Sequence, residues 1–282
     1  MGKICLVLAA IAASISCNRG RTESASGINS DTLAIDDTTA CDSILTDEQE
    51  DEGLSFENRS TEVFGDFIFA FTHNTRFQAE RIRFPLPVTD IDGTERTIKS
   101  GRQFRSEFRL PHNDYYTLLL GDQRQLDIVQ SDTALVNVSL QIIRLHQLTM
   151  DCYNFQRSEG RWYLMNRTES HVLPHLVDFF HFYDQFSTDT IFQQESLAPQ
   201  LKYTMDDPED DEADIEGTID SGQWPAFRPE MPHGEFVNID FGQSYPNPRR
   251  IYLFQCGISN GMLDIFTFQR DNERWRLTSF EN

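Results

Sequence analysis

Positive charge is scarce in this sequence. Its 282 residues include 24 Lys and Arg against 45 Asp and Glu, which gives a formal net charge of -21 at pH 7. Such a surface repels phosphates, so the composition excludes nucleic acid as a partner and electrostatic docking on anionic lipid. The excess of acid indicates a solvated, self-repelling surface, and a site for cations is the alternative.

Cysteine is also scarce, with five residues in the chain. Because there is no CxxC pair and no Cys/His cluster, the sequence predicts no zinc or iron–sulfur site and no other metal centre. Cys152 and Cys256 fall in different predicted domains. They are expected to be buried free thiols, with a bridge between them as the alternative.

The sequence also lacks the familiar catalytic motifs. It has no serine nucleophile elbow, P-loop, glycine-rich dinucleotide turn or HExxH helix. The motifs therefore predict no catalytic residue and no cofactor.

Long apolar runs are absent except at the N-terminus. Lys3 precedes an apolar run at Ile4–Ala13, which has the length of a signal peptide and is too short to span a membrane. Ser14-Ile15-Ser16-Cys17 resembles the lipobox of bacterial lipoproteins, although Ser14 stands where that motif usually has Leu. We expect residues 1–17 to be a lipoprotein signal with lipidation at Cys17. An ordinary secretory signal is the alternative.

Residues 18–55 contain no aromatic residue and end in an acidic run. Such a segment buries too little apolar surface to offset the entropy of ordering it, which predicts a disordered acidic tether. Asn18-Arg19-Gly20-Arg21 lacks the acidic cluster that promotes surface export. We therefore expect an exported, membrane-anchored protein on the periplasmic side rather than on the cell surface.

One phrase occurs twice beyond the tether. FQRSEGRW at 155–162 returns as FQRDNERW at 268–275, and Asp151 then falls on Asp264. Phe77-Gln78-Ala79-Glu80 likewise matches Phe192-Gln193-Gln194-Glu195. The shared order predicts a duplicated domain of about 110 residues, a usual domain size. Its two copies would cover residues 56–169 and 170–282.

Each predicted copy begins with helices and continues with strands. Phe and other apolar residues recur at helical spacing over 63–71 and 176–186, and a short helix is expected around 76–81 and 189–195. Alternating patterns then predict strands at 81–84, 115–120, 134–145, 149–157, 236–241, 250–258, 263–270 and 274–280. Each repeated phrase is expected to be a hairpin with its Trp facing inward.

Helices followed by a curved antiparallel sheet that ends in a strand–turn–Trp–strand hairpin resemble the NTF2-like (cystatin-like) α+β fold. FQAERIRFPLP at 77–87 and the two FQR…RW hairpins are most similar to two-domain NTF2-like lipoproteins of gut-dwelling Gram-negative anaerobes. The resemblance implies tandem NTF2-like domains and an envelope address, but no activity. It also implies that the halves pack on each other as an intramolecular pseudo-dimer.

An NTF2-like pocket would need inward-facing polar groups. The candidates for lining such a pocket are Tyr115, His146, Glu80, Glu195, Arg157 and Arg270. Each also has a plain structural interpretation: a surface residue, an ion pair after a short helix, or an arginine that stacks on neighbouring aromatics. The acidic stretch 206–216 is expected to be a solvated loop, with weak cation binding as the alternative.

These observations favour a lipid-anchored envelope protein that binds a small molecule or an envelope protein, or that serves assembly, without catalysis. The alternative is a small-molecule isomerase or hydrolase that uses the pocket of one domain.

Overall fold

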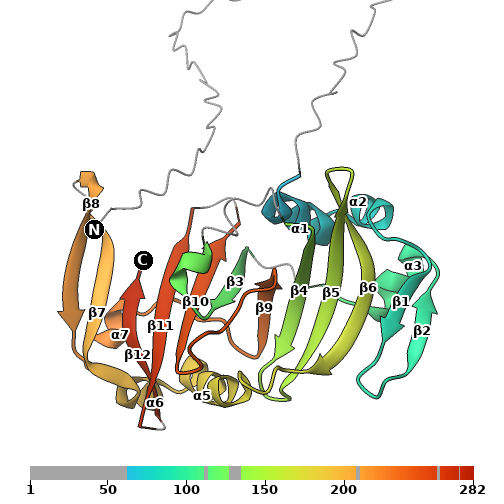
Figure 1. The fold of residues 1–282 in the computed structure, drawn as a ribbon. Coiled ribbons are helices and arrows are strands. Elements are labelled where there is room, and N and C mark those ends of the chain that lie inside the picture. The colour runs from blue at the N-terminus through green and yellow to red at the C-terminus, as the bar shows by residue number, and fades with distance from the viewer. Residues whose placement is uncertain (1–61, 111–113, 127–134, 208–209, 259–260, 273) are drawn as a thin grey trace, which may run out of the picture. The chain divides into compact units, whose positions relative to one another are not determined.

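Helices precede strands in each of two successive stretches of the chain (Figure 1). The computed structural model describes residues 62–110, 114–126, 135–207, 210–258, 261–272 and 274–282. The predicted signal, Cys17 and the tether lie outside these residues. The first stretch contains α1 (Phe64–His73), α2 (Thr75–Glu80), β1 (Leu86–Thr89), β2 (Glu95–Ile98), α3 (Gly101–Glu107), β3 (Tyr115–Leu120), the 3-10 helix η1 (Gln123–Gln125), β4 (Asn137–Arg144), β5 (Thr149–Ser158) and β6 (Arg161–His171). The second contains α5 (Val177–Thr188), α6 (Thr190–Glu195), β7 (Leu197–Asp207), β8 (Asp210–Ile219), α7 (Trp224–Phe227), β9 (Glu235–Asp240), β10 (Arg250–Gly257), β11 (Leu263–Asp271) and β12 (Arg274–Glu281).

The helices form where the sequence spacing and capping residues favour them. α1 and α5 each bury an aromatic stripe at helical spacing: Phe64, Phe67 and Phe71 in α1, and Phe179, Phe180, Tyr183 and Phe186 in α5. The side chain of Asn74 accepts hydrogen bonds from two backbone N–H groups at the start of α2, and Asp189 does the same for α6. In the part of the chain that the structure describes, no helix combines the length and the apolar character needed to span a bilayer.

The strands belong to one 12-stranded sheet with the order β2-β1-β6-β5-β4-β9-β3-β10-β11-β12-β7-β8. β3 pairs with β10 of the second stretch, and β9 pairs with β4 of the first. β3 and β9 then meet in parallel at the centre, where Thr117 is opposite Asn238. We expected a separate antiparallel sheet in each half, but the sheet is shared because each stretch gives one central strand to the other.

Two local predictions are wrong. The strand expected at 81–84 is a single bridge between Ile82 and Leu164, and β1 begins only at Leu86. The acidic segment expected as a loop lies largely in strands, since β7 and β8 pair antiparallel up to Asp207 and Asp210. Acidic residues therefore occupy an edge strand, where charge opposes edge-to-edge aggregation.

Two hydrophobic cores lie on opposite faces of the shared sheet. Leu118 and Leu120 pack in the cluster that contains α1, whereas Leu119 packs in the cluster that contains α5. Successive side chains of a strand point to opposite faces, so α1 and α5 cover opposite faces. All three leucines are buried, as expected for a strand covered on both sides.

Cys152 and Cys256 are both free thiols, the first buried and the second half-buried. Burial raises the pKa of Cys152 to about 11 and the pKa of Cys256 to about 12. Thiolate chemistry is therefore suppressed at neutral pH.

Candidate ligand-binding groove

The polar residues proposed from sequence do not converge on one site. Glu80 forms an exposed i,i+4 pair with Arg76, and Glu195 is exposed at the end of α6. The His146 side chain is 87% exposed, with its Nδ1 3.7 Å from a carboxylate oxygen of Asp184. Tyr115 is half-buried on β3, where burial, together with the charge of Glu230, raises its pKa.

Arg157 and Arg270 connect the repeated hairpins to the N-terminal end of each long helix. The Arg157 guanidinium lies 4.4 Å from the Trp162 ring centroid and donates to the Glu62 carbonyl at 3.1 Å. Arg270 contacts Asp178 at 3.1 Å, and the Trp275 indole N–H donates to the same carboxylate at 2.8 Å. These contacts are structural, because each one links a hairpin to the beginning of a helix.

Aromatic rings pack against one another between helix and sheet in both cores. Phe67 packs against Phe71, Phe77 and Phe155 at centroid distances of 5.3 to 5.9 Å. On the other face, Phe268 packs against Phe179, Tyr183 and Phe186 at 5.3 to 5.9 Å. Buried aromatic side chains thus lie between helix and sheet, where an NTF2-like pocket was expected.

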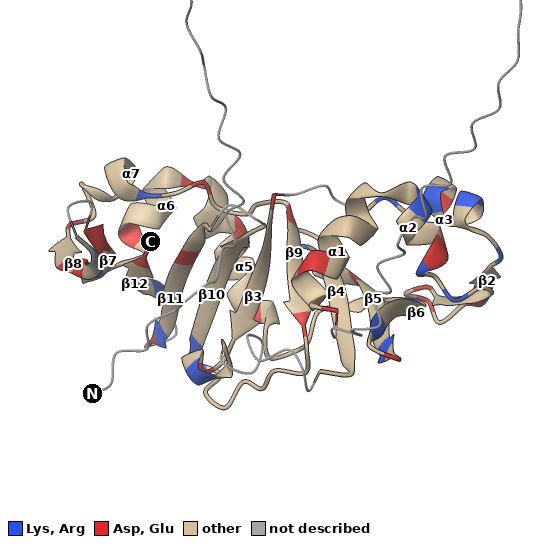
Figure 2. Cartoon of the chain, turned by 90° about the horizontal axis from the view of Figure 1, so that it is seen from above, with Lys and Arg blue, Asp and Glu red and all other residues tan. Residues whose placement is uncertain are grey.

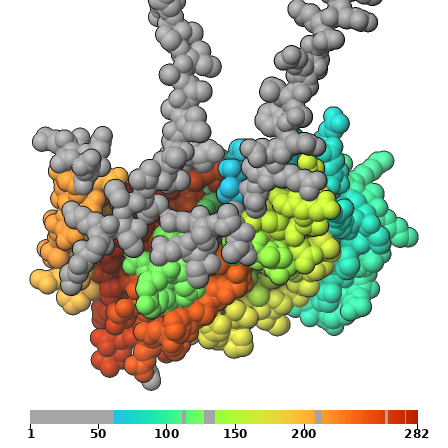
Figure 3. Space-filling model, turned by 45° about the horizontal axis from the view of Figure 1, so that its top comes forward, coloured from blue at the N-terminus to red at the C-terminus, as the bar shows by residue number. Residues whose placement is uncertain are grey.

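A polar groove of about 830 Å³ lies on the sheet of the second stretch. Its floor residues alternate along β10 and β11 with Leu253, Phe266 and Phe268, which pack against α5, so the groove is on the face opposite α5. η1 contributes Gln123 to the groove and lies beside the strands of the second stretch. In Figure 3 it belongs to the green segment that lies among orange and red ones. The lining residues are Gln123, Lys202, Tyr203, Thr204, Glu216, Gly217, Thr218, Arg250, Tyr252, Thr267, Gln269, Thr278, Ser279 and Glu281.

Strand register arranges the groove side chains in rows. Tyr252, Thr267, Ser279, Lys202 and Thr218 stand directly opposite one another on β10, β11, β12, β7 and β8. This row crosses four strand spacings of about 4.8 Å, or about 19 Å in total. It is therefore a transverse line of hydroxyl groups and one amine across the open sheet face.

A second row contains the carboxylates of the groove. Glu281, Thr204 and Glu216 are opposite one another on β12, β7 and β8. Burial raises the pKa of Glu281, and the charges of Asp214 and Glu216 add to the rise. Lys202 and Arg250 supply two positive groups against these two carboxylates, so the groove has no net formal charge.

The corresponding polar row of the first stretch is bonded within itself. Ser139, Asn154 and Asn166 are opposite one another on β4, β5 and β6. Ser139 donates to Asn154 at 2.5 Å, and the Asn154 amide donates to Asn166 at 2.6 Å. In the groove, Arg250 donates to Gln269 and Ser279 is hydrogen-bonded to Glu281. Lys202 and Glu216, by contrast, have no side-chain partner among the described residues, which leaves these two groups available to a ligand.

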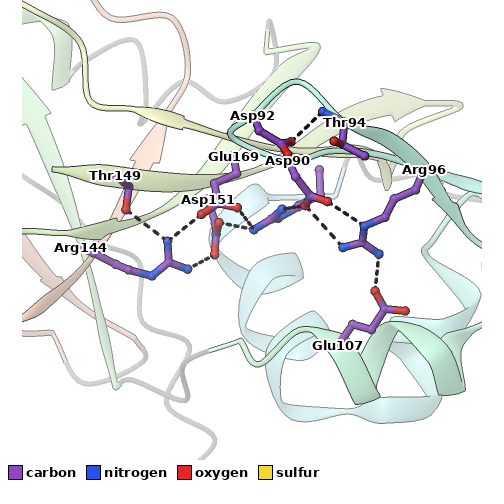
Figure 4. A network of polar contacts seen from close by, with 10 residues as sticks. Asp90, Asp92, Thr94, Arg96, Glu107, Arg144, Thr149, Asp151 and Glu169 are labelled. Atoms are coloured by element: carbon purple, nitrogen blue, oxygen red, sulfur yellow. Dashed lines mark hydrogen bonds and ion pairs between the residues drawn. The ribbon is translucent and has the colours of Figure 1, made fainter. Parts of the chain in front are cut away.

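The densest charge cluster has a structural role. Arg167, whose side chain is 5% exposed, contacts Asp90, Asp151 and Glu169, and Arg144 also contacts Asp151 (Figure 4). The Arg96 contact lowers the pKa of Asp90, and the Gln103 and Arg96 contacts lower that of Glu107. Arginines and carboxylates gather around α3 and β2 (Figure 2). The network therefore stabilises the packing of α3 and of the β1–β2 hairpin at this end of the sheet. Among the described residues, no group of three or more His, Cys, Asp or Glu side chains could hold a metal.

None of the groove residues was predicted from the sequence as part of a pocket. In the sequence these residues appear as Thr and Gln alternating with Phe over 265–270, and as Ser279 and Glu281 on either side of Phe280. Such outward positions are typical of any half-exposed strand. Only the register, which brings them into one row, distinguishes them from an ordinary solvated face.

Comparison with known proteins gives a family and a fold. The chain is similar to an NTF2-like protein from Bacteroides fragilis NCTC 9343 whose crystal structure was determined at 2.15 Å resolution. The two are 34% identical, the TM-score is 0.70, and the match covers 77% of this chain and 94% of the other. No curated protein matches the chain. The family described as "Domain of unknown function (DUF4348)" matches residues 43–282. The chain therefore belongs to the DUF4348 family and has an α+β, NTF2-like fold with helices followed by a curved sheet.

Proposed function

We propose that the protein is a binding module of the cell envelope, anchored by lipid at Cys17, that takes its ligand in the groove. One observation carries the binding role: the groove is open and polar, while aromatic rings pack against one another between helix and sheet in both cores. A ligand thus has access to the outer sheet face. Catalysis is not required for this role.

The test of this binding role is a ligand screen by thermal shift. Ser279, in the middle of the row, is changed to Phe to fill the groove, and Ser158→Phe at an exposed site on β5 is the matched control. Binders of the wild type are expected to be lost in Ser279→Phe and kept in Ser158→Phe. If Ser279→Phe still binds the ligands of the wild type, the groove is not their binding site.

The anchor rests on the sequence alone. The apolar run after Lys3, the small residues before Cys17 and the aromatic-free tether support export and lipidation, with the periplasmic side as the address. Palmitate labelling in a Gram-negative host should mark the wild type and leave Cys17→Ala unmarked. A labelled Cys17→Ala variant, or an unlabelled wild type, would overturn the anchor.

We also propose that the two stretches are tandem copies of one domain that pack as an intramolecular pseudo-dimer. The repeated hairpin phrases support this, as does a strand order in which β2-β1-β6-β5-β4 on one side has β8-β7-β12-β11-β10 as its counterpart on the other. Exchange of β3 and β9 would then be the contact between the copies.

A hydrolase acting on the groove ligand is the second candidate. The raised pKa of Glu281, which faces Glu216 across one intervening strand, favours it, because a raised pKa extends the pH range over which a carboxyl group keeps the proton that a general acid donates. Glu281→Gln should then abolish turnover while retaining ligand binding. Turnover that survives Glu281→Gln would exclude this role for the residue.

A further inference from the structure

We infer that the groove ligand is a neutral, hydroxyl-rich chain: a linear oligosaccharide that lies along the row from Tyr252 to Thr218. This inference rests on the proposed binding role of the groove and adds the chemical class of its ligand. Three properties of the groove carry it: balanced charge, hydroxyl chemistry, and an extended row of side chains that reaches the edge strand β8.

The charges of the groove oppose a charged ligand. Lys202 and Arg250 are balanced by Glu216 and Glu281, and Arg250 already donates to Gln269 at 3.3 Å. A polyanion would meet two carboxylates in the groove and a chain of net charge -21 around it. A polycation would meet Lys202, next to Ser279 in the row. Ligands without formal charge avoid both penalties.

The polar groups of the groove suit hydroxyl groups as partners. A hydroxyl both donates and accepts, and the lining contains six: Thr204, Thr218, Tyr252, Thr267, Thr278 and Ser279. Thr278 already donates to the Thr267 carbonyl and Ser279 is hydrogen-bonded to Glu281, so the other four are the ones left for a ligand. Lys202 adds donors, Glu216 adds acceptors, and neither has a side-chain partner among the described residues. The half-buried Tyr252 also offers a flat ring at one end of the row, an apolar surface on which a sugar ring can lie.

The shape of the groove favours a chain over a single small molecule. The row extends about 19 Å across five strands, and β8 at its far end is an edge strand. A peptide fits less well. Extended peptides are usually recognised through the backbone of a sheet edge, whereas the floor here is a sheet face whose backbone groups are already paired.

The inference is tested by titration calorimetry on the soluble chain from residue 18 onward. The neutral probes are cellohexaose and maltohexaose, each compared with its disaccharide. The comparison probes are hexagalacturonate, chitosan hexamer and a Gly-Ser hexapeptide. At least one neutral hexasaccharide should bind in the micromolar to millimolar range and about tenfold or more tightly than its disaccharide, because only the longer chain spans the row.

Removal of two floor hydroxyls provides the site-specific arm. Thr218→Ala/Thr267→Ala should weaken binding of the hexasaccharide about tenfold or more, since each lost hydrogen bond weakens binding severalfold. Thr97→Ala/Ser158→Ala removes two exposed hydroxyls of the first stretch and should bind like wild type. Ser279→Phe should abolish binding. Unchanged melting temperatures confirm that each variant is folded.

The inference is overturned if no neutral hexasaccharide binds, or if the alanine and Phe variants bind as wild type does. If a charged probe or the peptide binds instead, and Ser279→Phe abolishes that binding, the carbohydrate assignment is wrong and the groove remains the binding surface. If Ser279→Phe leaves the binding of every bound probe unchanged, the proposed binding role of the groove fails as well.

Discussion

Tyr183 is completely buried in α5, yet its hydroxyl has no hydrogen-bond partner among the described residues. Burial raises its pKa well above the ordinary value, so the group is neutral. A buried, unsatisfied hydroxyl costs about 1–3 kcal/mol. Tyr183→Phe removes it and keeps the ring contacts with Phe236 and Phe268. We expect the free energy of unfolding, measured in urea, to rise by up to that amount. A clear loss of stability would show that the hydroxyl has a partner.

Asp264 links stability to pH. It is 1% exposed and accepts a hydrogen bond from the Asn282 amide, and burial raises its pKa. Gln255 is directly opposite on β10, and its buried carbonyl oxygen has no partner among the described residues; a protonated Asp264 would donate to it.

Because the folded state holds this proton more tightly than the unfolded chain, the contribution of Asp264 to stability falls as pH rises. The fall begins at the unfolded pKa of about 4 and continues through the folded pKa, at about 1.4 kcal/mol per unit of pKa difference. Asp264→Asn keeps the acceptor for Asn282 and removes this dependence. Its stability relative to wild type should therefore increase as the pH rises from about 4 through the folded pKa. Urea unfolding at a series of pH values from about 4 upward tests this, and a difference in unfolding free energy that stays constant with pH would contradict it.

At the scale of elements, the Arg167 network joins the β1–β2 hairpin and α3 to β5 and β6. Arg167→Met leaves the buried carboxylate of Asp151 with only the Arg144 contact, and breaking such a buried pair costs about 3–5 kcal/mol. The matched control is Arg124→Met, which removes an 87% exposed arginine paired with Asp122 and should change stability far less, because solvent screens an exposed pair. Equal losses of unfolding free energy in the two variants would show that burial does not set the cost.

The sequence predicted the helices and strands better than it predicted which strands pair with one another. The Phe stripes of α1 and α5, the caps Asn74 and Asp189 and the Trp hairpins are local patterns, and each element formed close to its expected range. Strand alternation identifies a buried face but not the neighbouring strand, so the exchange of β3 and β9 was missed. The groove depends on that same long-range register, and for this reason the residue types alone did not reveal it.

At the scale of the whole molecule, the exchanged strands make the two halves interdependent. Residues 56–169 alone would leave β4 without β9 and β3 without β10, exposing Leu118, Leu119 and Leu120. We expect fragments 56–169 and 170–282 to be unfolded or aggregated when produced separately and to give native circular dichroism after co-refolding. The intact chain should elute as a monomer in gel filtration. Fragments that fold separately, or a stable homodimer of the intact chain, would contradict the pseudo-dimer.

The central claim is that ligands bind on the outer sheet face of the second half and not between helix and sheet. Backbone amide shifts recorded by NMR while the neutral hexasaccharide is added test this most directly. The shifts should concentrate at residues 202–204, 216–218, 250–252, 267–269 and 278–281, with α1 and α5 unaffected. Shifts concentrated on α5 around Tyr183, or on α1 around Phe67, would place the site in the core and contradict binding in the groove.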